Sequence, residues 1–466
     1  AQALDQAAPT SQLPAACMVL PVRRILGALA ISAVAASHLR PTLAWVAGRP
    51  ARPALLSSTR QPARGAAGWT SAAVVLVAAA TVTRKSRRTA TQALGVNPAT
   101  CWPEGKPRFT TEYTEVYDLS DPKGSFTRVG KMILQELVSE LPDLYEMPAK
   151  EVDWVSTSLE YNTQGGKMNR GLIVVATGAE VMKHLGQTPT NADLNRFAVL
   201  GWAVELLQAC MLMADDMMDG SLTRRGQECW YRLPDVGLLA TNDFLMTEMF
   251  VYKVLKRHFG QEEYFPWLVD LFLETTFQTE CGQLLDSICA NCELEELNTS
   301  RWELLVKYKT AFYSFYLPVA LAMIVAGIRE RKAFDIAREA LLLMGIYFQA
   351  QDDYLDAFAS PEVLGKVGTD IADKKCSWLF AHAYHEFANK EAKELLDTHY
   401  GQCAVGSEAE QMVKDLYKDL GLQELFQKYE QETEKSVESF QDKVREVGLP
   451  WSIFQRFFSL IYKRRK

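Results

Sequence analysis

Three aspartates are crowded into five positions of an otherwise apolar stretch, MADDMMDGSLTRRGQ, and two arginines follow them. The aspartates are Asp215, Asp216 and Asp219, and the arginines are Arg224 and Arg225. Carboxylates held this close repel one another and lose hydration where they are partly buried, so a positive charge normally lies among them. The arginines are one candidate for that charge, and a metal ion is the other.

A second acidic cluster repeats the spacing of the first. The stretch YFQAQDDYLDAF contains Asp352, Asp353 and Asp356, again in the pattern D-D-x-x-D. Residues four apart on a helix share a face, so each cluster presents its first and last carboxylates in one direction. Two such helices facing each other across a cavity predict a magnesium site that keeps coordination positions open for phosphate oxygens.

Simpler interpretations of these clusters have to be weighed first. A single motif of this type is often only a solvated helix face. An EF-hand is excluded, because Met217 and Gly226 stand where that loop needs oxygen ligands. Both clusters end long apolar segments, where carboxylates oppose the negative end of the helix dipole. This unfavourable placement of carboxylates occurs twice at the same spacing, which indicates a function.

Long amphipathic segments surround the clusters from about residue 109 onward. Apolar residues recur at helical spacing in residues 129–141, 195–219 and 334–358. No run of alternating β-branched residues competes with them, and no tandem repeat appears. We therefore expect one all-α domain over residues 99–466, an antiparallel bundle of long helices around a deep central cavity.

Charge is distributed unevenly along the chain. Residues 1–98 carry 11 Lys and Arg and a single acid, Asp5, whereas residues 99–466 hold 39 basic and 56 acidic residues. A body this acidic argues against nucleic acid as a partner. It does not argue against phosphorylated ligands, because divalent cations screen the repulsion between the two.

The nine cysteines form no disulfide framework, and several of them lie in apolar segments. That distribution suits a reducing compartment. One CxxC spacing joins Cys289 and Cys292, with no second pair and no histidine near it. We interpret it as a chance pair in a surface loop rather than as a zinc or redox site.

The first 98 residues have the composition of a targeting leader rather than of a folded domain. Residues 18–36 resemble a signal peptide, 37–68 form an acid-free stretch like a transit peptide, and 69–83 are a second apolar run before the basic stop at 84–88. The order resembles the bipartite leaders of proteins sent to complex plastids, and it predicts a plastid location. Mitochondrial and cytoplasmic locations are the alternatives. The chain would touch a membrane only through an uncleaved leader.

Several motifs, in this order, are similar to those of farnesyl diphosphate synthases. They are GGKMNRGL at 165–172, LLQACMLMADDMMDGSLTRRGQECWY at 206–231, VKYKTAFYSFYLP at 306–318, YFQAQDDYLDAF at 347–358, GKVGTDIADKKCSWL at 365–379 and the terminal IYKRRK. The resemblance runs from about residue 110 to the end. It implies the isoprenoid synthase fold, usually as a homodimer. It also implies head-to-tail condensation of isopentenyl diphosphate with dimethylallyl and geranyl diphosphates to give farnesyl diphosphate.

The resemblance assigns roles to the polar residues of these motifs. The two acidic clusters would bind the allylic diphosphate through three Mg²⁺ ions, with Asp353 and Asp356 in supporting positions. The other implied contacts are Arg224, Lys309 and Lys366 to the allylic diphosphate; Lys167, Arg170 and Arg225 to isopentenyl diphosphate; and Gln208, Lys375 and Arg465 as further substrate contacts. Thr310, Gln349 and the Lys309 carbonyl would stabilise the developing cation. The basic tail, residues 463–466, would close over the loaded site.

Charge and geometry fit these implied roles. A metal-free diphosphate site needs fixed positive charge and the fork of a guanidinium, which Lys167, Arg170 and Arg225 supply together. We therefore expect both arginines after the first cluster to bind diphosphates rather than the aspartates. A terpene cyclase would keep the acidic clusters but need not keep these cations. A catalytically silent regulatory subunit would commonly lose one cluster.

Two residues depart from the family pattern and bear on product length. Farnesyl-forming members typically place aromatic residues where this chain has Cys210 and Met211. Met211 lies one helical turn below Asp215, about 6 Å along the axis, on the side where a growing chain would descend. The smaller side chains open that layer unless a bulky neighbour fills it. We expect farnesyl diphosphate with a share extended to geranylgeranyl diphosphate.

Overall fold

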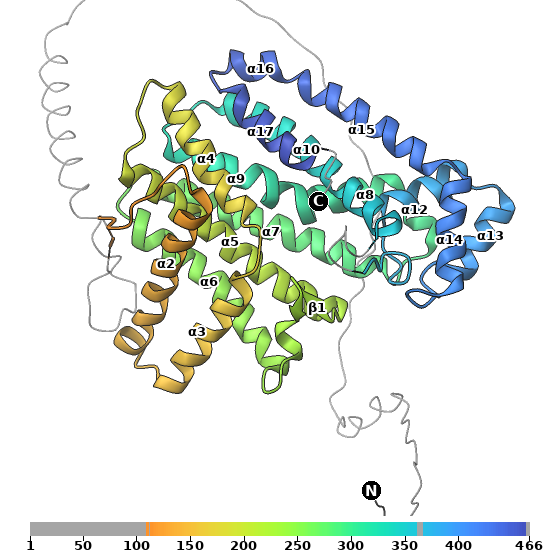
Figure 1. Ribbon diagram of the computed structural model, residues 1–466, viewed down its shortest axis with the longest axis horizontal. Helices are drawn as coiled ribbons and strands as arrows, with labels where there is room; N and C mark the ends of the chain where they lie inside the picture. The colour runs from red at the N-terminus through yellow and green to blue at the C-terminus, as the bar shows by residue number, and fades with distance from the viewer. Residues whose placement is uncertain (1–108, 111, 361–366, 463–466) are drawn as a thin grey trace, which may run out of the picture. The chain divides into compact units, whose positions relative to one another are not determined.

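Helices make up almost all the regular structure of the computed structural model, which describes residues 109–110, 112–360 and 367–462 (Figure 1). The three helices expected from periodicity are confirmed within α2, α5 and α10. The predicted leader, Lys366, and the basic tail with Arg465 lie outside the described residues.

The chain order of the longer helices is α2 (Pro122–Tyr145), α3 (Ala149–Thr163), α4 (Asn169–His184), α5 (Asn191–Asp219), α6 (Ala240–Phe259), α7 (Phe265–Cys289), α8 (Thr299–Val306), α9 (Leu317–Val325), α10 (Arg331–Phe358), α12 (Trp378–His382), α13 (Lys390–His399), α14 (Glu408–Asp419), α15 (Leu422–Glu438), α16 (Gln441–Glu446) and α17 (Trp451–Ile461). Shorter elements are β1 (Thr223–Arg224), β2 (Gln227–Glu228), the 3-10 turns η1 (Trp230–Arg232), η2 (Gly237–Leu239) and η3 (Leu294–Glu296), and the π-helical segments η4 (Lys307–Tyr316) and η5 (Ala383–Phe387).

Helix α5 is the central helix of the bundle, and it ends at the first acidic cluster. Its start is fixed by a capping box. The Thr190 side chain accepts from the Asp193 N–H, and the Asp193 carboxylate accepts from the Thr190 N–H. Its end is fixed by Gly220, whose φ of 65° only glycine adopts readily. Helix α5 carries buried apolar residues on all its faces, because α4, α6, α7 and α9 pack around it.

Two helical stretches of the described residues are long and apolar enough to cross a membrane, Asn191–Asp219 and Thr299–Val325. In each of them, however, 78% of the apolar window is buried inside the protein. A helix that is hydrophobic all round is expected in the core of a large domain, so we interpret both as core helices.

The second of these stretches is one continuous helix with a π-helical middle. Helix α8, η4 and α9 follow one another without a break, and η4 is wedged between α7 and α10. A Cβ on Gly282 of α7 would lie 2.1 Å from the Lys309 backbone nitrogen, and one on Gly345 of α10 would lie 2.7 Å from the Ala311 Cα. Two glycines therefore let η4 fit closely between its neighbours, in the kind of segment that often marks a functional site.

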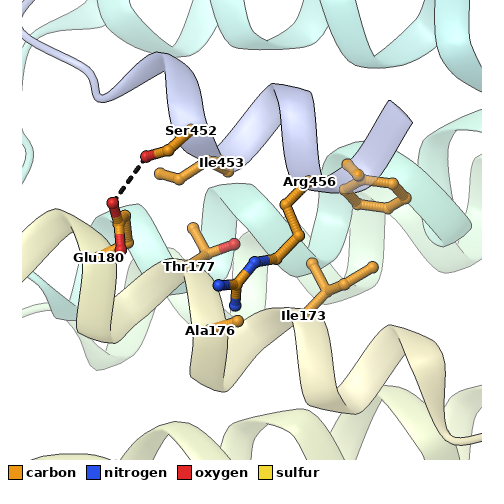
Figure 2. A pocket seen from close by; sticks show the side chains of 8 residues that line it. Ile173, Ala176, Thr177, Glu180, Ser452, Ile453 and Arg456 are labelled. Atoms are coloured by element: carbon orange, nitrogen blue, oxygen red, sulfur yellow. Dashed lines mark hydrogen bonds between the residues drawn. The ribbon is translucent and has the colours of Figure 1, made fainter. Parts of the chain in front are cut away.

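The last helix packs against α4, α10 and α16. Figure 2 shows α17 above α4, with the Ser452 hydroxyl donating to the Glu180 carboxylate at 2.7 Å and Arg456 reaching toward α4. The cavity between these helices holds only about 50 Å³. Substrate pockets are usually several times larger, about 300 Å³ or more, so this cavity is a packing gap rather than the substrate site.

The expectation of a surface-loop position for the CxxC pair is wrong. Cys289 is the last residue of α7 and is 1% exposed, and Cys292 is 8% exposed. The seven cysteines among the described residues are all free thiols.

Candidate active site

Three carboxylates from two helices meet at the centre of the site. Oxygens of Asp215 and Asp219 on α5 and of Asp286 on α7 all lie within 4.8 Å of one another. The structure thus brings together the two residues of the first cluster that share a helix face, as expected. It adds Asp286, which the sequence reasoning missed because it belongs to no acidic motif.

Two lysines lie among these carboxylates. Lys309 of η4 places its Nζ 3.1 Å from Asp215 and 2.5 Å from Asp286. Lys375 places its Nζ 2.9 Å from both Asp219 and Asp286. Burial alone would raise the pKa of Asp286, but the two ammonium groups hold it below its usual range. Burial likewise opposes the charge of Lys309, yet Asp215 and Asp286 raise its pKa.

The donor set of this cluster fits a magnesium ion. Mg²⁺ prefers carboxylate oxygens and is usually held by only one or two carboxylates plus substrate phosphates. Each carboxylate offers about four lone-pair directions, so the three can accept from lysines and still ligate a metal. The lysines also place positive charge among the carboxylates.

The contacts of Arg224 differ from those expected, because it was predicted to bind a diphosphate rather than the aspartates. It projects from the β1–β2 hairpin and donates to Asp216 through Nε at 2.9 Å and to Asp215 through a terminal nitrogen at 3.1 Å. The hairpin turn makes this possible, because Arg225 and Gly226 both have positive φ, at 56° and 78°. The first arginine therefore pairs with the aspartates. Arg225 does not, because it donates to the backbone oxygens of Asn162 and Gln164.

The middle aspartate of each cluster turns into the core instead of into the cavity. Asp216 is 4% exposed and Asp353 is 6% exposed. Asp353 accepts from the indole of Trp302 and the backbone N–H of Trp378, both at 2.8 Å. Burial raises its pKa, although these donors stabilise the charged form. Asp216 was expected as a metal ligand and Asp353 in a supporting position, and the structure gives both of them hydrogen bonds that support the site.

The other two residues of the second cluster lie on the last turns of α10. Asp356 is 5% exposed and accepts from the backbone N–H of Asp370 at 3.0 Å, which ties the following loop to α10. Asp352 is only partly buried. Of this cluster, Asp352 is therefore the carboxylate best placed to serve a ligand.

The two residues expected beside the developing cation are in contact. The Thr310 hydroxyl of η4 donates to the Gln349 amide oxygen of α10 at 3.2 Å, and the Gln349 amide nitrogen donates to Asp353 at 2.9 Å. Asp353 thus orients Gln349, and Gln349 orients Thr310. This series of hydrogen bonds fixes the directions of two neutral dipoles, the Thr310 hydroxyl and the Gln349 amide.

The expected metal-free diphosphate site lies at the start of α4. Arg170 donates to the Ser314 hydroxyl at 2.8 and 2.9 Å and stacks over the Tyr313 ring at 5.0 Å. Lys167 is exposed, and Gln208 of α5 is partly buried. A Cβ on Gly166 would lie 3.0 Å from the Arg225 guanidinium carbon, so glycine there permits a close approach.

A cavity of about 420 Å³ opens beside this region, lined by Thr157, Glu160, Tyr161, Gln164, Gly165, Arg225 and Gln227. Its volume lies in the range of small-molecule pockets. Beneath the cations, Glu205 of α5 is buried and accepts from the Gly171 N–H at 2.8 Å. Burial raises the pKa of Glu205, and Arg170 and Arg225 partly offset that effect. Sequence reasoning also missed this carboxylate.

The two residues that bear on product length lie one turn before the first cluster. Cys210 is 3% exposed, and Met211 is partly buried against the main core. Burial raises the pKa of Cys210 to about 12, and Glu248 and Glu280 add to the shift. Cys210 therefore stays a neutral, small side chain in the core of the bundle.

Comparisons with known proteins agree with this geometry. A family model described as polyprenyl synthetase matches residues 152–420. The farnesyl pyrophosphate synthase of Saccharomyces cerevisiae is 45% identical over 349 residues, which cover 73% of this chain and 97% of that protein. The farnesyl pyrophosphate synthase of Bos taurus is 45% identical over 346 residues, covering 73% and 94%. The T. brucei farnesyl diphosphate synthase complexed with risedronate superposes with a TM-score of 0.67 at 32% identity, covering 74% and 100%.

Proposed function

Because the chain belongs to the polyprenyl synthetase family, we propose that two of its sites bind the two diphosphate substrates of one reaction. The first, the acidic site, is the group of Asp215, Asp219 and Asp286 with Lys309 and Lys375, and the second, the basic pocket, is the region of Lys167, Arg170 and Arg225. The reaction is head-to-tail condensation of isopentenyl diphosphate with dimethylallyl and geranyl diphosphates to give farnesyl diphosphate. The observation that carries this function is 45% identity to farnesyl pyrophosphate synthases over nearly their whole length. The terpene cyclase and the silent subunit find no support in these relatives.

The acidic site is the site for the allylic diphosphate. Asp215, Asp219 and Asp352 would hold Mg²⁺, three ions by analogy with the family, with Asp286 beside them. Bound there, the ions neutralise the charge of the departing diphosphate. Lys309 and Lys375 add fixed positive charge to the same leaving group. Thr310 and Gln349 orient their dipoles toward the developing allylic cation.

The basic pocket is the site for isopentenyl diphosphate. Arg170 and Arg225 are held by neighbouring groups, so their forks are oriented before a ligand arrives. Lys167 is exposed and adds a flexible charge two residues after the pocket-lining Gly165, and Gln208 of α5 is partly buried. We extend the proposal to Lys366 and Arg465, whose expected contacts with substrate lie outside the described residues.

Metal removal should separate the two sites. Isopentenyl diphosphate is expected to bind the metal-free protein with little loss of affinity, because arginine and lysine side chains, rather than a metal ion, supply the positive charge of its site. An unreactive thio analogue of geranyl diphosphate should lose at least about a hundredfold in affinity without Mg²⁺. Calorimetric titrations with and without a chelator measure both effects. An equal loss for the two ligands would contradict the assignment of separate sites.

We further propose that the product is farnesyl diphosphate with a share of geranylgeranyl diphosphate. Cys210 and Met211 occupy less volume than two aromatic rings would in the same layer of the bundle. Replacing both by phenylalanine should confine the product to fifteen carbons, while exchanging Cys281 for serine should leave the product ratio unchanged. Chromatography of the products with excess isopentenyl diphosphate is the measurement. If the unmodified protein makes only the fifteen-carbon product, the proposal of a geranylgeranyl share is refuted.

A homodimer is the expected assembly. Helices α6 and α7 lie together and carry an exposed apolar face, formed by Leu245 and Met249 on α6 and by Leu273, Phe277 and Leu284 on α7. Residues at this spacing share one helix face, and exposed apolar residues gathered on two packed helices support a protein interface. Sedimentation of the chain and of a Phe277→Glu variant would test it, since a monomeric unmodified chain contradicts the proposal.

We retain plastid targeting as a proposal from the leader sequence alone. A fluorescent fusion of residues 18–98 should accumulate in the plastid. A fusion that stays in the cytosol or enters mitochondria would overturn the proposal.

A further inference from the structure

A buried carboxylate that belongs to neither proposed site joins two tryptophans. Asp243 lies in the first turn of α6 and is 4% exposed. One oxygen of its carboxylate accepts from the Trp154 indole of α3 at 2.9 Å, and the other accepts from the Trp230 indole of η1 at 2.8 Å. An indole has a single N–H to donate, and a buried carboxylate costs free energy unless hydrogen bonds satisfy it. Asp243 therefore fixes the orientations of two large rings at once.

The two tryptophans form one aromatic group with Tyr161. Trp154 and Tyr161 are seven residues apart on α3, so they share a helix face. The centroids of their rings lie 5.8 and 5.2 Å from the centroid of the Trp230 ring. Rings at these distances and inclined to one another attract. Trp230 is thus held both by its hydrogen bond to Asp243 and by two rings of α3.

Trp230 directly follows the hairpin that carries two arginines of the candidate sites. The Cys229 N–H donates to the Leu222 carbonyl at 3.0 Å and closes the hairpin one residue before Trp230. The Tyr161 hydroxyl donates to the Glu228 carbonyl at 2.8 Å, which ties β2 to α3. A shift of Trp230 would therefore be transmitted to β1 and β2.

The same hairpin contributes to both proposed sites. Arg224 of β1 donates to Asp215 and Asp216. Arg225, in the turn, donates to the Gln164 carbonyl at 3.0 Å and lines the cavity of about 420 Å³. The position of the hairpin thus sets where two guanidinium groups lie, one beside the acidic site and one in the basic pocket. A guanidinium binds a diphosphate well only when its fork is correctly directed.

We propose that Asp243 is a positioning residue. It acts through Trp154 and Trp230 to hold the β1–β2 hairpin, and it thereby orients Arg224 and Arg225 for the two diphosphates. The identity of those ligands rests on the proposed function. A displacement of about 1 Å in a positioning group can cost up to about a hundredfold in rate, so a residue outside both proposed sites can control both of them.

The first test is Asp243→Asn, which keeps the size of the side chain but turns an N–H₂ group toward one indole N–H, donor against donor. The amides of residues 222–229 should exchange hydrogen for deuterium at least about tenfold faster, with the helical content unchanged by circular dichroism. Calorimetry should show the Kd of isopentenyl diphosphate rising about tenfold. The KM for isopentenyl diphosphate should rise with it, with a smaller change in kcat.

A second substitution gives a rescue that a general loss of packing would not. Trp154→Phe removes one of the two indole donors, so in the double variant with Asp243→Asn the amide oxygen accepts from Trp230 and the N–H₂ group faces no donor. The double variant should therefore bind isopentenyl diphosphate more tightly than Asp243→Asn does. Trp230→Phe breaks the same link from its other end and should also weaken binding, which keeps the test decisive if Asp243→Asn does not fold. Asp270→Asn, at an exposed position of α7, is the matched control and should bind like the unmodified chain.

Three results would overturn the proposal. They are unchanged hydrogen exchange of the hairpin in Asp243→Asn, faster exchange with unaltered affinity for isopentenyl diphosphate, and a double variant that binds no better than Asp243→Asn. The exchange measurement needs no substrate, and the unmodified chain is titrated beside the variants. Failure of the unmodified chain to bind isopentenyl diphosphate would therefore count against the proposed function, while the exchange of the hairpin would still decide whether Asp243 holds it.

Discussion

Replacing Asp215 by alanine lowers the rate of prenyl transfer by at least about a hundredfold and leaves the helical fold in place. The carboxylate lies in the group that fits Mg²⁺, and it also accepts from Lys309 and Arg224. Its loss removes a proposed metal ligand and leaves both cations without one of their partners. Steady-state kinetics in saturating Mg²⁺, with circular dichroism for the fold, measure the effect.

Two further variants give that measurement its controls. Asp352→Ala should reproduce the loss, because Asp352 is the partly buried member of the second cluster. Asp270→Ala removes an exposed carboxylate from α7, outside the site, and should keep a near-normal rate. A near-normal rate for Asp215→Ala would refute the assignment of the first cluster.

Replacing Asp286 by alanine is expected to reduce both stability and activity. The side chain is 7% exposed and joins Lys309 to Lys375, so its removal sets two ammonium groups against each other. Hydrogen bonds to charged groups each stabilise a fold by about 1.5–3 kcal/mol. Because Asp215 and Asp219 remain as partners, we expect a net loss of about 2 kcal/mol of unfolding free energy. Denaturant titration measures it, and the rate should fall about a hundredfold.

The stability effect of Asp286 should depend on pH with a definite sign. The two lysines hold the pKa of Asp286 below its ordinary value of 3.8. Its contribution is therefore fully present above about pH 4 and is lost as the pH falls through the lowered folded value. Unmodified chain and Asp286→Ala should converge only in strongly acidic solution. A stability difference that is the same at pH 7 and near pH 2 would contradict the paired geometry.

Helical periodicity and the repeated acidic spacing were enough to predict the bundle and the helix ends that carry the clusters. Asp215 and Asp219 meet because residues four apart share a face, and Asp216 turns inward because a neighbour on a helix is rotated by about 100°. The inward direction of Asp353 follows from the same geometry. The resemblance implied a supporting position for Asp353 but not the direction of its side chain.

Other parts of the site depend on contacts that no local pattern encodes. Asp286 stands alone in an apolar helix, and only its burial among lysines reveals a role. The pairing of Arg224 with the aspartates depends on a two-residue turn with positive φ at Arg225. The close packing of η4 depends on Gly282, which sequence reasoning had no reason to single out. Tertiary contacts of this kind override local propensity.

The central claim is that one cavity joins isopentenyl diphosphate to an allylic diphosphate. The most direct measurement incubates the purified chain with isopentenyl and dimethylallyl diphosphates and Mg²⁺, omits each substrate in turn, and identifies the products by mass spectrometry. We predict that farnesyl diphosphate forms when both substrates are present and does not form when either is omitted. A hydrocarbon or alcohol formed from the allylic diphosphate alone, or no prenyl product at all, would contradict the account.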